Sequence, residues 1–444
     1  MLARFILQYI HIGKASTIPA NQNYLFIRSF RRYYFPEPGK PLEVIETNFC
    51  ELGQTGISDF VKNPTGAARF ISTDPCVLSS IAAIPVESKN VSTLLLGSTA
   101  GMRVLKLSKP LIARQILENL SNELGVVSNG LKHDVKVLTG EEEGLDGWVT
   151  ANYLLDRLEK GEQVGALDWG GASSQITRTV ESTGNNVNLT INGKIYNLMA
   201  RSNLCYGQSE AYKRNMASLF YDNFANVENF DNLTDEVILT DPCLPKNYKS
   251  PPIALENIFN SPCTSLQDKS FMEKIMGKRM NVVFKAGQNH SSCSNNILKL
   301  FDPSTCQAKF EAIDGEETCM DSNVIPEPGS LKFLAFSTYW YLANGLNLTN
   351  SFTLNEFNNQ MTELCSSSIH SSKLAKLKDL ASRACFQATF MKHMLTEAYH
   401  FNEDTWTQIS FVKRISDAEV GWSLGHAIAH ASKDKFRKEA LFIR

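Results

Sequence analysis

Between residues 91 and 177, short apolar runs alternate with segments of helical periodicity. The runs "VSTLLLGS", "VKVLTG" and "QVGALDWGG" have the length of buried strands and end in small residues. Residues 109–125 form a predicted helix with Pro110 near its start and Gly125 as its stop, and residues 141–161 form a second one closed by Gly161. Strands that alternate with helices of this length build βαβ units, so the chain is predicted to be α/β with a largely parallel sheet.

Three of the predicted turns follow strand ends: "GSTAGMR" (97–103), "TGEEEGLDGW" (139–148) and "ALDWGGASSQIT" (166–177). Ligands of open α/β sheets bind beyond the carboxyl ends of the strands, so these turns are expected to meet at one site. In the third turn, Gly170 and Gly171 free backbone N–H groups that can bind an anion, and Asp168 stands beside them. This pattern favours a phosphate accompanied by a divalent cation; an ordinary glycine-rich turn is the alternative.

The overall composition argues against nucleic acid as a partner. The chain has 444 residues, 43% of them hydrophobic, and a formal net charge of −2. Nucleic-acid-binding domains carry a basic patch or stripe, and the one basic cluster here, residues 432–444, is interpreted as a solvated end. The length allows two or three domains with a substantial core.

Ten cysteines indicate disulfides and an oxidising compartment, because no two are closer than 13 residues and no metal or redox pair can be recognised. Six glycosylation sequons also favour an extracellular or secretory-pathway location. The start, "MLARFILQYIHIG", is a poor signal sequence, and "FLAFSTYWYLANGL" is too short and too polar to cross a bilayer, so we expect an atypical signal or incomplete ends. The sequons begin at Asn90, Asn119, Asn188, Asn232, Asn289 and Asn347.

The rest of the chain is less regular. Residues 1–45 lack periodicity, and "RSFRRYYFPEPGKP" is interpreted as loop or extended chain. From about residue 200 the chain becomes rich in cysteines and loops. Helical patterns return at 330–347, 353–365 and 373–396, and a last helix is expected near "VGWSLGHAIAHA".

The three turns, taken together, resemble conserved regions of the ecto-apyrases, the ectonucleoside triphosphate diphosphohydrolase family. This chain has "LLGSTAGMR", "GEEEGLDGWVTANYLL" and "GALDWGGASSQIT" in the family's order and spacing. Later pieces, "LCYG", "AFSTYWY", "YHF" and "VGWSLGH", are also similar, so the resemblance runs from about Cys50 to His426. It implies a two-lobed actin-like, RNase H-like fold with mixed sheets flanked by helices and a disulfide-rich second lobe. The implied reaction is divalent-cation-dependent hydrolysis of nucleoside tri- and diphosphates to the monophosphate and inorganic phosphate.

The resemblance also assigns catalytic roles. Glu143 stands in the place of the family's catalytic glutamate and would be the general base. Without the motif, Glu141, Glu142 and Glu143 would be a solvated helix start favoured by the helix dipole. Ser173 and Gln175 would hold the attacking water, since alternation in an extended segment places both on one face.

The same motifs imply a nucleotide site with Ca²⁺ or Mg²⁺. Asp168 would bind the cation through coordinated waters, and the backbone of Gly170, Gly171 and Ala172 would cradle phosphate. Thr99 should contact the site as well. For Arg103 we favour a structural ion pair over a role in the site.

Several further residues lie within family motifs. Tyr341 matches an aromatic that stacks on the nucleobase, although "FSTYWY" alone would be read as a buried helix face. Gln208 stands where relatives often carry a basic residue, which would weaken a base or phosphate contact there. Trp148 and Trp422 are as compatible with packing as with function.

The family pattern suggests four disulfides and leaves Cys306 to pair with Cys319. A metal site at His426 and His430, four residues apart on a predicted helix, is rejected because no third ligand is evident. The suggested pairs are Cys50–Cys76, Cys205–Cys263, Cys243–Cys293 and Cys365–Cys385.

One part of the family pattern is missing. The first lobe of such proteins opens with a phosphate-gripping hairpin of the type DAGSSxT, and residues 1–45 contain no Asp and no matching Gly-Ser run. We therefore expect the first strands of this lobe to be absent, which would expose a sheet edge. The alternative function is a catalytically impaired or inactive relative that only binds nucleotide.

The expected division of the chain follows from these points. Relatives can associate with membranes, but we expect no transmembrane helix in this sequence. A homo-oligomer is possible. The expected parts are an atypical segment (1–45), an incomplete first lobe (46–163), a second lobe with a disulfide-rich insertion (164–400) and a C-terminal segment whose helix returns to the first lobe (401–444).

Overall fold

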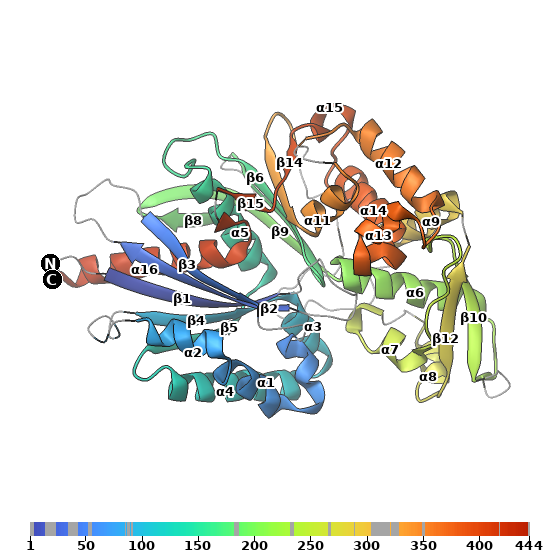
Figure 1. Ribbon diagram of the computed structural model, residues 1–444, viewed down its shortest axis with the longest axis horizontal. Helices are drawn as coiled ribbons and strands as arrows, with labels where there is room; N and C mark the ends of the chain where they lie inside the picture. Colours follow the sequence, from blue (N-terminus) through green and yellow to red (C-terminus); the bar gives the residue numbers. More distant parts are fainter. Residues whose placement is uncertain are drawn as a thin grey trace.

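A computed structural model gives the fold as two lobes, each built around one mixed sheet (Figure 1). Among the described residues, side chains are included for those between 56 and 432 other than 376, 378 and 379; for the strands before residue 52 and for 433–442 the backbone alone is described. The described residues are 4–13, 24–33, 43–51, 56–84, 86, 89, 92–181, 186–230, 235–264, 268–287, 289–302, 320, 328–348, 351–416 and 418–442.

The first sheet has the strand order β3-β2-β1-β4-β5. Its first three strands are antiparallel neighbours, and β4 and β5 then continue parallel to β1. The strands are β1 (Arg4–Gly13), β2 (Tyr24–Tyr33), β3 (Glu43–Glu51), β4 (Thr93–Ser98) and β5 (Lys132–Val137).

The prediction that the first strands of this lobe are absent is therefore wrong. Residues 4–51 contribute three of the five strands of the first sheet. Strand β2 could not be recognised in the sequence, because Arg28, Arg31 and Arg32 interrupt its apolar run and remove the period-two pattern of a half-buried strand. The turn between β1 and β2, where the family's first phosphate loop is expected, lies outside the described residues.

The second sheet repeats this plan with the order β8-β9-β7-β6-β13-β14. Here β6 and β7 form the antiparallel hairpin, β9 follows β7 antiparallel, and β13 and β14 lie parallel to β6 on its other side. The strands are β6 (Gly165–Trp169), β7 (Ser173–Thr179), β8 (Val187–Ile191), β9 (Lys194–Leu204), β13 (Phe333–Ser337) and β14 (Ile409–Phe411).

Alternating side chains on the strands bury apolar residues in three layers. On β4, Leu94 and Leu96 pack against the helices of the first lobe, whereas Leu95 points the other way, toward the residues of α5 and α16. On β13, Leu334 and Phe336 join that same middle layer, and Phe333 and Ala335 face the large core of the second lobe. Helices α5 and α16 therefore lie between the two sheets, as Figure 1 shows.

The helices follow the predicted pattern with two differences at their ends. Helix α4 runs through Gly125 to Val127, and α5 ends at Leu154, before the left-handed turn at Asp156, instead of reaching Gly161. The first-lobe and middle-layer helices are α1 (Pro64–Ser72), α2 (Pro75–Ala82), α3 (Ala100–Ser108), α4 (Pro110–Val127), α5 (Gly140–Leu154) and α16 (Trp422–Phe442). Those of the second lobe are α6 (Gln208–Phe224), α7 (Leu255–Phe259), α8 (Lys269–Ile275), α9 (His290–Leu298), α11 (Thr338–Gly345), α12 (Leu354–Ser366), α13 (Ser372–Lys376), α14 (Ala384–His393) and α15 (Glu403–Trp406).

A small third sheet and three disulfides mark the second lobe as the cysteine-rich one, as predicted. The sheet has the order β10-β12-β11, formed by β10 (Glu236–Asp241), β11 (Ile253–Ala254) and β12 (Asn281–Ala286). The pairings Cys205–Cys263, Cys243–Cys293 and Cys365–Cys385 are confirmed. Cys76 is disulfide-bonded. The side chains of Cys50, Cys306 and Cys319, on which the other two predicted pairs depend, lie outside the described residues.

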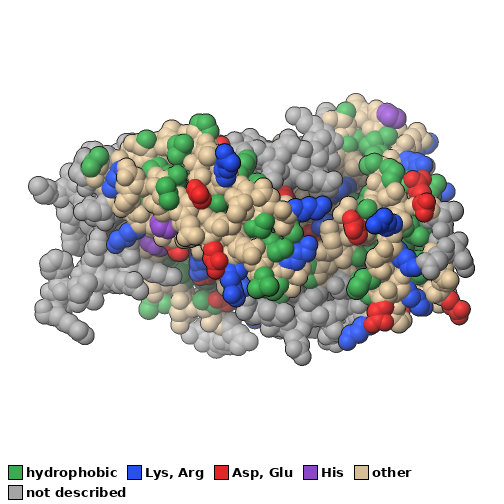
Figure 2. Space-filling view, turned by 90° about the horizontal axis from the view of Figure 1, so that it is seen from below, with side chains coloured by type: hydrophobic (Ala, Val, Ile, Leu, Met, Phe, Trp, Pro, Cys, Tyr) green, Lys and Arg blue, Asp and Glu red, His purple; other side chains and the backbone are tan. Residues whose placement is uncertain are grey.

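On the face seen from below, the described Lys, Arg, Asp and Glu side chains are interspersed (Figure 2). Within the described residues, none of the helices combines the length and apolar character that crossing a membrane requires.

Candidate active site

Three consecutive glutamates at the start of α5 have three different surroundings. Glu141 is exposed. Glu142 forms a capping box with Thr139 and an ion pair with Lys136. Glu143 is buried, with 6% of its surface exposed. The solvated-helix-start alternative therefore describes Glu141 and Glu142, and Glu143 is the carboxylate that enters the protein.

Glycines bring α5 close enough to the second sheet for Glu143 to reach it. A Cβ added to Gly140 would lie 2.2 Å from Ser202 Oγ, and one added to Gly144 would lie 2.7 Å from Thr177 Oγ1. Both distances are shorter than van der Waals contact, so any larger residue would push the helix away from β7 and β9. The glycines of "TGEEEGLDGW" thus serve helix–sheet packing.

Glu143 belongs to a buried polar cluster that joins α3, α5 and β7. Arg103 Nη2 lies 3.0 Å from Glu143 Oε2 and 3.0 Å from Ser173 Oγ, while its Nη1 donates to the Leu138 carbonyl at 3.1 Å. Gln175 Nε2 lies 2.7 Å from Ser173 Oγ and 3.3 Å from Glu143 Oε2. The structure therefore brings the three predicted catalytic side chains, Glu143, Ser173 and Gln175, to one point.

Ser202 completes this cluster from the neighbouring strand. It is paired directly opposite Gln175 in the β7–β9 ladder, and the Gln175 amide donates to Ser202 Oγ at 2.8 Å. These contacts fix the amide orientation and leave the buried Gln175 Oε1 without a hydrogen-bond partner among the described residues. An unpartnered buried acceptor is costly, and a bound water would satisfy it.

Asp168 lies near the carboxyl end of β6, directly opposite Gln175 in the β6–β7 ladder. Its carboxylate has 6% of its surface exposed, and burial raises the pKa of Asp168 to about 6 against a smaller lowering by a hydrogen bond from Ser337. Asp168 Oδ1 has no hydrogen-bond partner within the described structure. Ser337 itself has a φ of 59° with ψ −128°, a strained conformation for a residue with a side chain.

The turn between β6 and β7 is held tightly by the segment that begins α6. The N–H of Gly170 donates to the Ser173 carbonyl at 3.0 Å, so it is used within the turn. A Cβ on Gly207 would lie 2.2 Å from the Ala172 nitrogen, which leaves room only for glycine at that approach. The expected phosphate cradle at Gly170, Gly171 and Ala172 therefore loses the Gly170 N–H as a donor.

The residues around Asp168 fit a water-coordinated divalent cation better than a directly ligated metal. Among residues whose side chains are described, no three His, Cys, Asp or Glu side chains stand together as a metal-binding group. Asp168 offers a buried carboxylate with one oxygen unused. A hard cation such as Mg²⁺ or Ca²⁺ commonly keeps several waters and needs few protein ligands, and this donor set suits it.

Other predicted residues lie at the edge of this site or away from it. Thr99 caps α3 one turn before Arg103. Tyr341, on α11, is half-buried. Trp148 and Trp422 are buried in the middle layer, with 0% and 3% of their surfaces exposed, and have the surroundings of packing residues.

Two polar residues discussed from the sequence also have clear surroundings. Gln208 is buried at the start of α6, where its side-chain oxygen accepts a hydrogen bond from Gln387. His426 Nδ1 lies 2.7 Å from Asp146 Oδ2 and so links α16 to α5.

Sequence reasoning missed four residues that contact the site. Arg103 was expected to be structural, yet its partners are Glu143 and Ser173. Ser202 carried no motif signal. Ser337 lies within the motif "AFSTYWY" at the end of a buried strand, but no role was assigned to it. Tyr399, within "YHF", is fully buried and its hydroxyl lies 2.9 Å from Ser174 Oγ.

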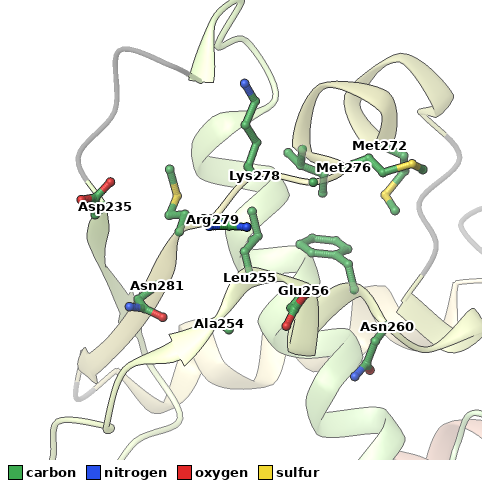
Figure 3. A pocket seen from close by; sticks show the side chains of 14 residues that line it. Asp235, Ala254, Leu255, Glu256, Asn260, Met272, Met276, Lys278, Arg279 and Asn281 are labelled. Atoms are coloured by element: carbon green, nitrogen blue, oxygen red, sulfur yellow. The ribbon is translucent and has the colours of Figure 1, made fainter. Parts of the chain in front are cut away.

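A separate cavity lies in the disulfide-rich part of the second lobe and contains none of the predicted site residues. It has a volume of about 750 Å³ and opens between β11, α7 and α8. Figure 3 shows Arg279 near its middle, with Leu255 and Met276 on its walls.

The sequence of this chain is similar to a protein-family model and to several known proteins. The family model described as GDA1/CD39 (nucleoside phosphatase) matches residues 37–442. Ectonucleoside triphosphate diphosphohydrolase 3 of Homo sapiens is 30% identical over 407 residues, which cover 87% of this chain and 72% of that protein. Ectonucleoside triphosphate diphosphohydrolase 8 of Gallus gallus is 32% identical over 402 residues, covering 86% and 76%.

A solved structure supports the fold independently. The structure described as nucleoside triphosphate hydrolases from Neospora caninum aligns with a TM-score of 0.62 and 15% identity, covering 98% of this chain and 93% of that one. At this identity the likeness concerns the fold alone, and it agrees with the two-lobed α/β architecture.

Proposed function

Because the chain belongs to the GDA1/CD39 (nucleoside phosphatase) family, we propose that it hydrolyses nucleoside tri- and diphosphates to the monophosphate and inorganic phosphate. The relatives are described as ectonucleoside triphosphate diphosphohydrolases. The observation that carries the proposal is the buried cluster of Glu143, Gln175 and Ser173 beside the unpaired carboxylate oxygen of Asp168.

Glu143 activates the attacking water in this proposal. Gln175 Oε1 accepts one hydrogen of the water, and Ser173 Oγ holds the water from the same face of β7. The Glu143 carboxylate takes the other proton as the water oxygen attacks the terminal phosphorus. The bond from that phosphorus to its bridging oxygen breaks, and the nucleotide leaves one phosphate shorter. Arg103 fixes the positions of Glu143 and Ser173 through its two contacts at 3.0 Å. Arg103 is thus a positioning residue.

The β6–β7 turn and Asp168 bind the phosphates. The N–H groups of Gly171 and Ala172 are the proposed donors, and Asp168 would hold Ca²⁺ or Mg²⁺ through water. The cation, when bound, neutralises phosphate charge. Thr99, which follows the carboxyl end of β4, would contact this site from the first lobe, and Tyr341 would stack on the nucleobase.

The sequons and the disulfides seen among the described residues support a location in the extracellular space or the secretory-pathway lumen. Of the sequon asparagines that the structure describes, Asn188, Asn289 and Asn347 are exposed, as glycosylation would require, and Asn119 is half-buried.

Nucleotide binding without turnover is the second candidate. One observation favours it: the chain contains no aspartate before Asp59, so the β1–β2 hairpin has no counterpart of Asp168. Half of the phosphate clamp of a two-lobed phosphatase would then be missing, and loss of one transition-state donor costs roughly a hundredfold or more.

Phosphate release by Glu143→Gln, compared with Glu141→Gln, tests the proposed role of the cluster. Both variants replace one glutamate in the first turn of α5, but Glu141 is exposed. Glu143→Gln should lower the rate by about 10² to 10⁴, the range of general-base catalysis, and Glu141→Gln should leave it near the wild-type value. Equal rates in the two variants would refute Glu143 as the base.

A further inference from the structure

Two neighbouring aromatic side chains and one lysine form a cluster at the start of α11. The rings of Trp340 and Tyr341 meet edge to face with centroids 5.0 Å apart. The Lys413 ammonium lies 5.6 Å from the centroid of Trp340 and 5.2 Å from that of Tyr341. All three side chains are half-buried. A cation at these distances is attracted by both rings.

This cluster lies on the same edge of the second sheet as Asp168. Ser337, whose side chain hydrogen-bonds Asp168, is the last residue of β13, and Tyr341 follows it by four residues, or about 6 Å along α11. Lys413 follows β14, the parallel neighbour of β13, where the Val412 N–H donates to the Ala335 carbonyl at 2.9 Å. Parallel strands bring these chain segments out at one edge.

We propose that Lys413 selects the nucleobase, favouring bases with a keto oxygen over those with an amino group at the same position. The inference rests on the proposed function, in which the base stacks on Tyr341. A base on that ring lies within reach of an ammonium 5.2 Å from its centroid. The ammonium has three donors and no acceptor. It therefore pairs with the keto oxygen of guanine, hypoxanthine or uracil and cannot accept from the amino group of adenine or cytosine.

Two other roles for Lys413 make different predictions. A phosphate contact would affect every nucleotide equally, because all share the same phosphates. A purely packing role, with the ammonium held between the rings, would affect the stability of the fold and would not distinguish bases.

The test compares Lys413→Met with the wild type on two matched pairs, ITP against ATP and UTP against CTP, which contrast keto and amino groups. We expect kcat/KM for ITP and UTP to fall about tenfold through KM, with ATP and CTP changing less than about twofold. Lys413→Arg should retain the preference, since it keeps the donors. Lys332→Met, an exposed lysine just before the opposite end of β13, is the matched control. An equal fall for all four nucleotides, or no change, would overturn the proposal.

Equilibrium binding separates this inference from the proposed function. IDP and ADP can be titrated without cation, with tryptophan fluorescence as the signal. If the wild type released no phosphate but Lys413→Met weakened IDP about tenfold more than ADP, the inference would stand and the proposed function would fail. Equal weakening of IDP and ADP would refute the inference even in an active protein.

Discussion

The two lobes repeat one strand plan but carry unequal chemistry. In the first sheet, the hairpin β1–β2 is followed by β4 and β5, and in the second the hairpin β6–β7 is followed by β13 and β14. Asp168 pairs with Phe336, next to the last residue of β13; at the matching register of the first lobe, His11 pairs with Gly97, next to the last residue of β4. The second hairpin thus has a carboxylate where the first has an imidazole.

The difference between Asp168 and His11 at matching registers indicates that the fold and the candidate site depend on different residues. Alternating apolar residues such as Leu94, Leu95 and Leu96 fix each sheet between its helix layers. The chemistry depends on single positions at the strand ends, which can change without altering the sheet. A family member can therefore keep its architecture while one half of its phosphate site departs from the pattern.

Asp168→Asn should have the largest effect on phosphate release, because it removes the carboxylate that the second hairpin carries and the first lacks. We expect cation-dependent phosphate release to fall about a hundredfold or more, with Ca²⁺ or Mg²⁺ no longer raising the rate. Rates measured over a cation titration provide the test. A variant that kept the wild-type cation response would place the cation elsewhere.

The pH dependence of cation binding should follow the raised pKa of Asp168, about 6. Protons and cations compete for this carboxylate, so the apparent cation affinity should weaken as the pH falls through about 6. Calorimetric titration of Ca²⁺ between pH 5 and pH 8 measures it. A Ca²⁺ affinity that stays unchanged between pH 5 and pH 8 would exclude Asp168 as the cation ligand.

Without cation, the same buried carboxyl should make stability fall as the pH rises. The folded pKa lies above the unfolded value of 3.8, so between about pH 4 and pH 6 the folded state holds a proton that the unfolded state has lost. Denaturant unfolding of Asp168→Asn should show a smaller decline over this range. Asp241, whose pKa burial also raises to about 6, should retain its own part of the decline.

His11→Asp would place a carboxylate in the first hairpin at the register that Asp168 occupies in the second. We expect cation-dependent release to increase about tenfold, part of what a well-placed group in a phosphate site contributes. Gln8→Asp, which adds the same charge in β1 opposite Leu94, is the control and should give no increase. A gain in both variants would indicate a general charge effect.

Tyr399→Phe should have the smallest effect, about 1 kcal/mol on the free energy of unfolding. It removes the buried hydrogen bond between Tyr399 and Ser174, which lies next to Ser173 on β7. Tyr221→Phe is the control, since it removes a longer and less buried hydrogen bond, which the Tyr221 hydroxyl donates to Asp268 Oδ2 at 3.3 Å. A smaller loss in Tyr399→Phe than in this control would contradict the account.

The sequence predicted the parts of the fold that local patterns encode. The strands at β4, β5 and β6 were visible because apolar runs end in small residues. The end of α4 was misplaced at Gly125, which in the structure packs against His133: an added Cβ would lie 3.2 Å from His133 Cε1. A glycine needed for a close approach within a helix has the same sequence appearance as a helix stop.

The proximity of candidate site residues could be predicted where one motif holds them, as with Ser173 and Gln175. Contacts across long separations could not be predicted in this way. Arg103 reaches Ser173, 70 residues later, and Ser202 reaches Gln175 across the β7–β9 ladder. Such contacts follow from strand register and helix packing, which no local pattern in a single sequence specifies.

The most direct test of the central claim is phosphate release from ATP and ADP by the disulfide-intact wild-type chain, with Ca²⁺ and with EDTA. The account predicts release from both nucleotides that ends at AMP and stops when EDTA removes the cation. Absence of release from folded protein that still binds ADP would contradict it, and would identify the chain as a nucleotide-binding member of its family.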